Sequence, residues 1–112
     1  MQSEILKRLN QERGRRRPVV LVTILSTRGS TPRKAGSQML VFEDGSIFGT
    51  IGGGQAEGLS MAAAAEAFKT GVSSPHKMTM TASVAASEGM ACGGDMEVFV
   101  QYVGPEGASE HE

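Results

Sequence analysis

The strongest constraint on the fold is an uninterrupted apolar segment near the start of the chain, PVVLVTILS at residues 18–26. β-Branched residues dominate it, and apolar side chains occupy successive rather than alternate positions. Alternation would give a strand with one buried face, whereas this run predicts a strand buried on both faces. Such a strand lies in the interior of a sheet, so other segments must supply neighbouring strands and covering helices.

Two helices are predicted. The first begins with Ser3 as its N-cap, carries Ile5, Leu6 and Leu9 at helical spacing, and stops at Gly14. The second covers the alanine-rich residues 59–69, and Gly71 is a good residue just beyond a helix end.

The remaining strands are predicted from turns and alternation. Two short strands flank the turn Glu43-Asp44-Gly45, because Asp-Gly between apolar runs favours a hairpin. Residues 76–83 alternate, and residues 96–103 form a last strand. The alternation puts three apolar side chains on one face: Met78, Met80 and Ala82.

We therefore expect an α/β fold, with α+β possible, as a single mixed β-sheet of about five strands with two main helices packed against it. The order is helix, strand, hairpin, helix, strand, strand, and it leaves the order of strands within the sheet open. Residues 1–103 are expected to form one domain, and residues 104–112 a disordered tail.

Composition and cysteine content bear on the cellular location of the protein and on metal binding. No apolar run is long enough to span a bilayer, and the N-terminus lacks the apolar segment of a signal peptide. The single cysteine, Cys92, excludes an internal disulfide and fits a reducing compartment, so a cytoplasmic location is expected. Cys92, His76 and His111 lack metal-site spacing, and no metal is expected.

Nine of the eleven Lys and Arg residues lie at or before Lys34. The cluster RGRRR at residues 13–17 is open to two interpretations, a nucleic-acid contact or a solvated helix end where cations complement the helix dipole. The cluster lacks interleaved aromatic residues, which favours the second interpretation. Nucleic acid is therefore not expected as a partner, and neither is a membrane.

Three glycine-rich segments are candidates for chemistry, and the first is GTIGGGQAEG at residues 49–58. A strand that leads through glycines into a helix presents free backbone N–H groups, which suit an anion. The dinucleotide fingerprint fails because Glu57 occupies the place of its last glycine. From the residues alone, an anion site and a plain tight turn both remain open.

The second segment, TRGSTPRKAG at residues 27–36, is not a phosphate-binding Walker loop, because Lys34 stands where that motif needs glycine. It still gathers cations and hydroxyl groups that suit a phosphate or a polyanionic cofactor. An exposed basic connector is the alternative.

The third segment, GMACGGDMEVF, contains Cys92 just before two glycines. Its thiol is either an accessible nucleophile or a small buried apolar group.

Together, residues 26–57 and 89–100 resemble the N-terminal domain of the XdhC/CoxI family, the xanthine dehydrogenase accessory proteins. The resemblance implies an accessory or chaperone domain, rather than a catalyst, that binds molybdenum cofactor (molybdopterin). Such a domain supports sulfuration of the cofactor and its insertion into a xanthine dehydrogenase-like molybdenum hydroxylase.

Carried over by position, residues 52–57 match the family's Gly-Gly-Gly-Cys-x-Glu element and residues 92–94 its Cys-Gly-Gly element. Any catalytic thiol is then Cys92, because Gln55 stands where many members have cysteine. We call residues 27–36 the basic loop. The cofactor-binding residues implied by the resemblance and by this loop are Arg28, Ser30, Thr31, Arg33, Lys34, Gly52, Gly53, Gly54, Glu57, Cys92, Gly93 and Gly94.

The expected partners follow from the same resemblance. They are a molybdenum hydroxylase subunit, a cysteine desulfurase, a second copy of the chain, or a separate chain with the Rossmann-like domain that most full-length members carry. The alternative function is a divergent stand-alone domain that acts as a regulatory or protein-interaction module without cofactor delivery.

Overall fold

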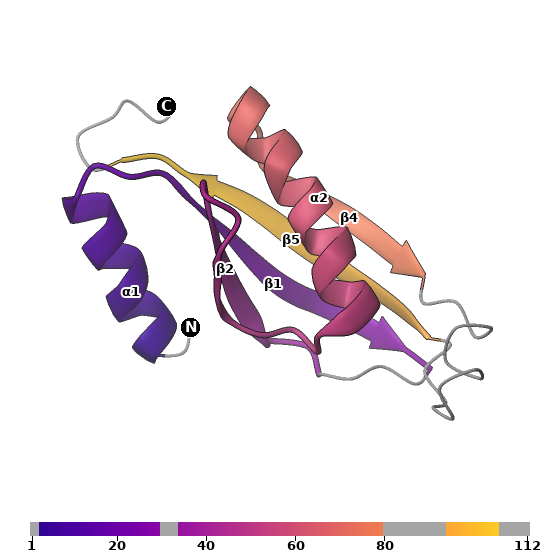
Figure 1. Ribbon diagram of the computed structural model, residues 1–112. Helices are drawn as coiled ribbons and strands as arrows, with labels where there is room; N and C mark the ends of the chain where they lie inside the picture. The colour runs from indigo at the N-terminus through magenta and orange to yellow at the C-terminus, as the bar shows by residue number, and fades with distance from the viewer. Residues whose placement is uncertain (1–2, 30–33, 80–93, 106–112) are drawn as a thin grey trace.

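The computed structural model describes residues 3–29, 34–79 and 94–105. They form one five-stranded sheet and two helices (Figure 1), which confirms the expected fold class, α/β with α+β possible, and the expected numbers of strands and helices. The elements along the chain are α1 (Ser3–Gly14), β1 (Val19–Arg28), β2 (Gln38–Phe42), β3 (Ile47–Gly49), α2 (Gly54–Thr70), β4 (Ser74–Thr79) and β5 (Asp95–Val103).

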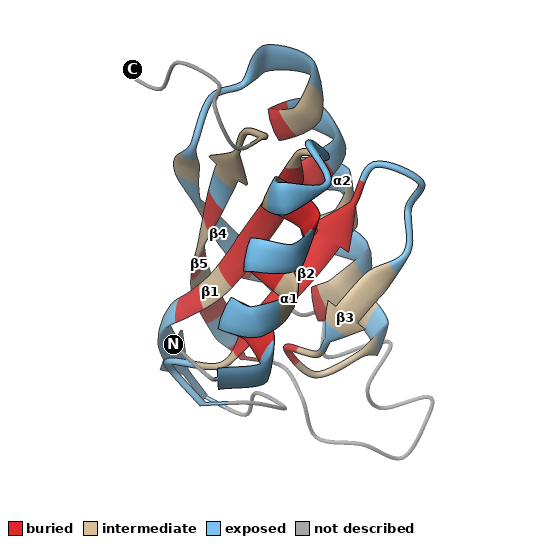
Figure 2. Cartoon of the chain, turned by 90° about the vertical axis from the view of Figure 1, so that its left-hand side faces the viewer, coloured by how far each residue is buried: buried red, intermediate tan, exposed pale blue. Residues whose placement is uncertain are grey.

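Strand β1 occupies the middle of the sheet, whose order is β3-β2-β1-β5-β4. Its residues from Val19 to Val22 are all buried, as is Ile24. In Figure 2 the neighbouring strands β1 and β2 are largely in the colour of buried residues. The prediction of a central strand buried on both faces is confirmed, and the strand continues beyond the apolar run to Arg28.

The strand directions correct one expectation. Every described strand pair is antiparallel, so the sheet is not of mixed direction and is the α+β variety that the sequence left open. A helix between two strands often joins parallel neighbours. Here α2 carries the chain from β3 at one edge of the sheet to β4 at the other, so these two strands never pair.

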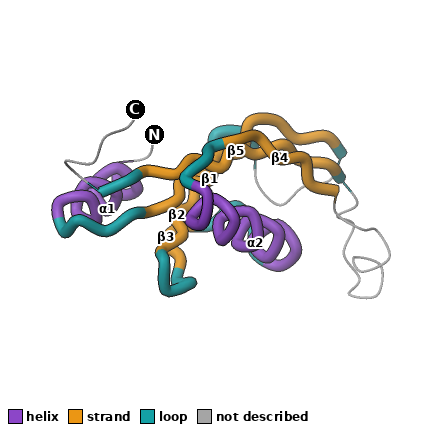
Figure 3. The backbone as a smooth tube through the Cα atoms, turned by 90° about the horizontal axis from the view of Figure 1, so that it is seen from above, coloured by secondary structure: helices purple, strands orange, loops and turns teal. Residues whose placement is uncertain are grey.

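The two helices cover opposite faces of the sheet. Successive side chains of a strand point to opposite faces, and each helix packs against a different alternate set of β1 residues. Helix α1 packs Ile5 and Leu9 against a cluster that includes Leu21 and Leu40. Helix α2 packs against the other face, where the cluster includes Val20 and Val22 (Figure 3). Helix α1 reaches only one end of its face, the end where β1 begins.

Helix α2 begins five residues earlier than predicted, at Gly54 rather than residue 59. Glycine disfavours a helix locally, but Ala56 in the first turn is 1% exposed, so tertiary packing sets the start. The predicted end is confirmed: Gly71 adopts the left-handed conformation with φ of 70°, and its N–H donates to the Ala67 carbonyl oxygen at 2.7 Å.

Strand β4 begins at Ser74, two residues before its predicted start. Met78 is buried and faces α2, as the alternation indicates, whereas Met80, Ala82 and the tail at residues 106–112 lie outside the described residues. Among the helices of the described residues, neither is long and apolar enough to cross a membrane.

Candidate functional site

The end of β1 and the start of β5 approach each other closely. A Cβ atom added to Gly29 would lie 3.2 Å from the Cα atom of Gly94, and Gly29 has a positive φ of 76°. A side chain at position 29 would therefore force these backbones apart. This approach brings Gly29, directly after β1, against Gly94, directly before β5, although the two residues lie far apart in the sequence.

Residues 36 and 37 are also hydrogen-bonded to β1. The Gly36 N–H donates to the Ile24 carbonyl oxygen at 2.8 Å, and the Ile24 N–H donates to the Ser37 carbonyl oxygen at 2.9 Å. Lys34 is exposed, and its carbonyl oxygen accepts from the Ser37 N–H. The described residues that follow Lys34 therefore run beside Ile24 of β1.

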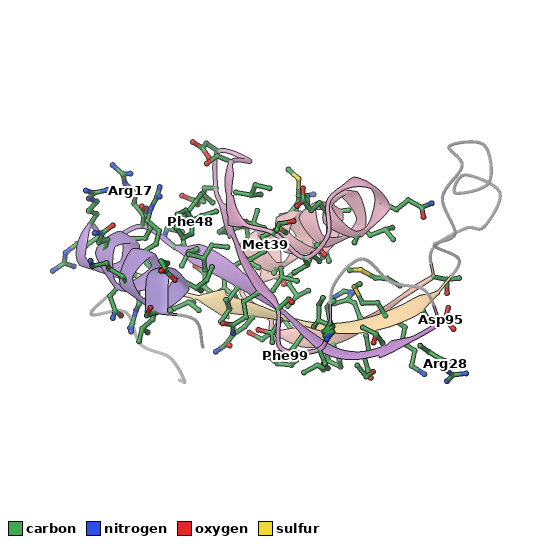
Figure 4. All side chains as sticks on the ribbon, turned by 90° about the horizontal axis from the view of Figure 1, so that it is seen from below. Arg17, Arg28, Met39, Phe48, Asp95 and Phe99 are labelled. Carbon is green, nitrogen blue, oxygen red and sulfur yellow. The ribbon has the colours of Figure 1, made fainter. Side chains whose placement is uncertain are left out.

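A cavity of about 460 Å³ lies at this end of the sheet. Three residues from each of three strands line it, namely residues 26–28 of β1, 95–97 of β5 and 77–79 of β4. Arg28 is thus a lining residue, and Figure 4 shows it at the same end of the sheet as Asp95. The volume is within the range of small-molecule pockets.

The triple-glycine turn has a conformation that requires glycine. Gly52, Gly53 and Gly54 have φ values of 129°, 73° and 55°. A Cβ on Gly53 or Gly54 would meet no atom within 4 Å among the described residues, so these glycines serve the backbone conformation rather than a close protein contact. No side chain caps the start of α2 by a hydrogen bond.

Glu57 is held above this turn by Thr50. The Thr50 hydroxyl donates to Glu57 Oε2 at 2.5 Å, and its oxygen accepts the Gly52 N–H at 2.9 Å. The Glu57 carboxylate therefore lies at the N-terminal turn of α2, where it competes with a phosphate for the same positive end of the helix dipole. Thr50 was not among the predicted site residues, although a threonine two residues before a turn glycine is a recognisable signal.

The triple-glycine turn is attached to a different strand from the Gly29–Gly94 contact. A Cβ on Gly49, three residues before the turn, would lie 3.1 Å from the Gln38 carbonyl oxygen at the start of β2. The structure therefore brings Gly29 of the second predicted segment against Gly94 of the third, whereas the first segment lies beside the start of β2, which directly follows the second.

Five of the predicted site residues lie outside the described residues: Ser30, Thr31, Arg33, Cys92 and Gly93. Both interpretations of the Cys92 thiol stay predictions. In the part of the chain that is described, no group of three or more metal-binding side chains comes together.

The basic cluster at residues 13–17 surrounds a buried carboxylate. Glu12 is 3% exposed, Arg8 Nε lies 3.2 Å from its Oε2, and Arg15 and Arg17 each lie 3.8 Å from one of its oxygens. The Arg8 guanidinium also stacks on the Phe42 ring, 4.8 Å from its centroid. This cluster stabilises the end of α1, away from Arg28 (Figure 4).

Comparisons with known proteins give a family match, a curated relative and a similar solved structure. Residues 13–81 match the model of the XdhC and CoxI family. The chain is 39% identical over 87 residues to the YqeB protein of Escherichia coli strain K12, covering 78% of this chain and 16% of that protein.

A solved structure, of a xanthine dehydrogenase (BH1974) from Bacillus halodurans, is similar with a TM-score of 0.74 and 27% identity. That similarity covers 89% of this chain and 30% of the other, so this chain spans less than a third of either relative. The family match includes both the basic loop and the triple-glycine turn. The chain therefore belongs to the XdhC and CoxI family.

Proposed function

We propose that this chain is an accessory domain that binds molybdenum cofactor and supports its sulfuration and its insertion into a xanthine dehydrogenase-like molybdenum hydroxylase. Membership of the XdhC and CoxI family supports the proposal, as does the similarity to a protein named xanthine dehydrogenase. The observation that carries it is the Gly29–Gly94 approach, which joins two of the family's segments beside a cavity.

The described residues fit the phosphate of the cofactor. Arg28 lines the cavity and Lys34 is exposed, so a guanidinium and an ammonium group are available to a phosphate. The triple-glycine turn fits a phosphate less well, because the Glu57 carboxylate lies at the start of α2. We therefore assign the phosphate to Arg28 and Lys34.

The bound cofactor would supply the molybdenum chemistry, and the chain would hold and orient it. Gly29 and Gly94, each next to a lining residue of the cavity, allow the two backbone segments to approach each other closely there. Cys92 stays the predicted thiol for sulfur handling, with a cysteine desulfurase as the corresponding partner. The hydroxylase subunit is the proposed recipient, and cytoplasm the proposed location.

Retention of released cofactor tests the function. Purified protein is mixed with molybdenum cofactor released from a donor enzyme, and the pterin is followed through gel filtration. We expect the pterin to elute with the wild-type protein and to be lost with Arg28→Gln, because the guanidinium pairs with the phosphate. Arg16→Gln is the matched control, since Arg16 is exposed at the end of α1 and its change removes the same charge.

Wild-type protein that carries no pterin at micromolar concentration would contradict the proposal. It would favour the second candidate, a regulatory or protein-interaction module without cofactor delivery. The observation behind that candidate is Gln55, which stands at the position where many family members have a cysteine.

A further inference from the structure

Six polar side chains form a grid at the cavity end of the sheet. The strand register places Arg28 of β1 opposite Asp95 of β5, and Asp95 opposite Thr79 of β4. Two residues along, it places Ser26 opposite Glu97 and Glu97 opposite Lys77. Side chains directly opposite each other in antiparallel strands share a face and lie about 5 Å apart at Cβ.

The grid lies on the face of the sheet that α2 does not cover. Met78 and Met96, which alternate with the grid residues, are buried in the cluster that α2 covers. Side chains of neighbouring residues on a strand point to opposite faces, so the grid faces away from α2. Helix α1 packs at the other end of that face, against Val19 and Leu21.

The charged side chains of the grid form no ion pairs within the described part of the chain. Arg28, Lys77, Asp95 and Glu97 take part in no ion pair with another described residue. All four line the cavity of about 460 Å³. Two carboxylates therefore occupy the middle strand of a cavity whose outer strands each supply one cation.

This arrangement suits a ligand that carries N–H donors and an anionic group on the same molecule. A carboxylate only accepts hydrogen bonds, and its two oxygens match two parallel N–H groups. The 2-aminopyrimidin-4-one ring of pterins presents such a pair, a ring N–H beside an exocyclic amino group. The carboxylates of β5 should weaken the binding of a free phosphate to Arg28, because a phosphate offers them no N–H donor.

We infer that Asp95 and Glu97 bind the aminopyrimidinone edge of a pterin while Arg28 binds its phosphate. This inference rests on the proposed function and adds the residues that select the ring. Neither carboxylate was among the predicted site residues, because only the pairing of β5 with β1 and β4 brings them beside Arg28.

Calorimetric titration of the full chain with neopterin monophosphate, and separately with inorganic phosphate, tests the inference. We expect Asp95→Asn and Glu97→Gln each to weaken binding of neopterin monophosphate by about tenfold or more, and to leave binding of inorganic phosphate unchanged or tighter. Arg28→Gln should weaken binding of both. Glu43→Gln removes the same charge from the exposed hairpin turn and should change neither affinity.

The outcomes separate this inference from the proposed function. If wild-type protein retains released molybdenum cofactor but Asp95→Asn and Glu97→Gln bind neopterin monophosphate as wild type does, the inference is wrong and the function stands. If both variants lose pterin binding while wild type fails to retain the released cofactor, the inference stands and the function is wrong. Wild-type protein that binds neither overturns both.

Discussion

At the scale of single residues, Gly29 and Gly45 have the same backbone requirement in different surroundings. Both have positive φ, 76° at Gly29 and 90° at Gly45. A Cβ on Gly45 would meet nothing within 4 Å among the described residues, whereas on Gly29 it would press on the Gly94 Cα atom. Glycine at position 29 is therefore required for two reasons, its positive φ and the close approach of the Gly94 backbone.

We predict that Gly45→Ala lowers the free energy of unfolding by about 1 kcal/mol, the usual cost of a left-handed conformation for an L-residue. Gly29→Ala should cost about 1 kcal/mol more, because backbone atoms must also move apart. Chemical denaturation of both variants measures the difference. Equal losses would contradict the close approach of β1 and β5 ends.

At the scale of elements, the β2–β3 hairpin shows how a turn is stabilised by its own side chains. The Ser46 hydroxyl donates to Asp44 Oδ1 at 2.6 Å, and the Ser46 N–H donates to the same oxygen at 2.9 Å. These bonds favour the ionised carboxylate, the side-chain bond most, and they hold the pKa of Asp44 below its ordinary value of 3.8. Asp44, the first residue of the Asp-Gly signal that predicted the hairpin, is therefore also the acceptor for the hydrogen bonds of the turn.

We predict that Ser46→Ala raises the pKa of Asp44 toward its ordinary value, which an NMR pH titration of the Asp44 carboxyl carbon measures. Because the pKa is lowered by folding, the stabilisation is complete above pH 3.8 and is lost as the pH falls through the lower folded value. The stability difference between wild type and Ser46→Ala should therefore shrink in acid. An unchanged Asp44 pKa in the variant would contradict this assignment.

At the scale of the whole molecule, one sheet separates two hydrophobic clusters. Ile5 belongs to the cluster under α1, and Ile24 to the larger cluster under α2. The sheet backbone lies between them, so a change in one cluster need not alter packing in the other. Both clusters draw residues from the strands β1 and β2.

We predict that Ile5→Val and Ile24→Val each lower the free energy of unfolding by about 0.5–1.5 kcal/mol. Their effects should add to within about 0.5 kcal/mol in the double variant, because the two side chains belong to separate clusters. Urea denaturation of the four proteins in the cycle measures the coupling. A coupling of about 1 kcal/mol or more would show that the two faces are not independent.

Much of the fold could be predicted from local patterns. Helical spacing, an alanine-rich stretch, the continuous apolar run, the Asp-Gly turn and alternation together indicated all seven elements in their observed order. Those signals are local, since each depends on the period of side chains or on one turn. A dense basic segment is visible without a structure, and it predicted Arg28 and Lys34 as candidate cations for a phosphate.

The sequence by itself therefore determined the elements, the central place of β1 and the family resemblance of the glycine-rich segments. Only the tertiary structure decided strand order, strand direction and which charges meet. The register between β1 and β5 shifts between Ile24 and Ser26, and after that shift Arg28 lies opposite Asp95. A slip of one residue turns every side chain of a strand to the other face, so an irregularity that no local pattern indicates placed the cation and the carboxylates on one face.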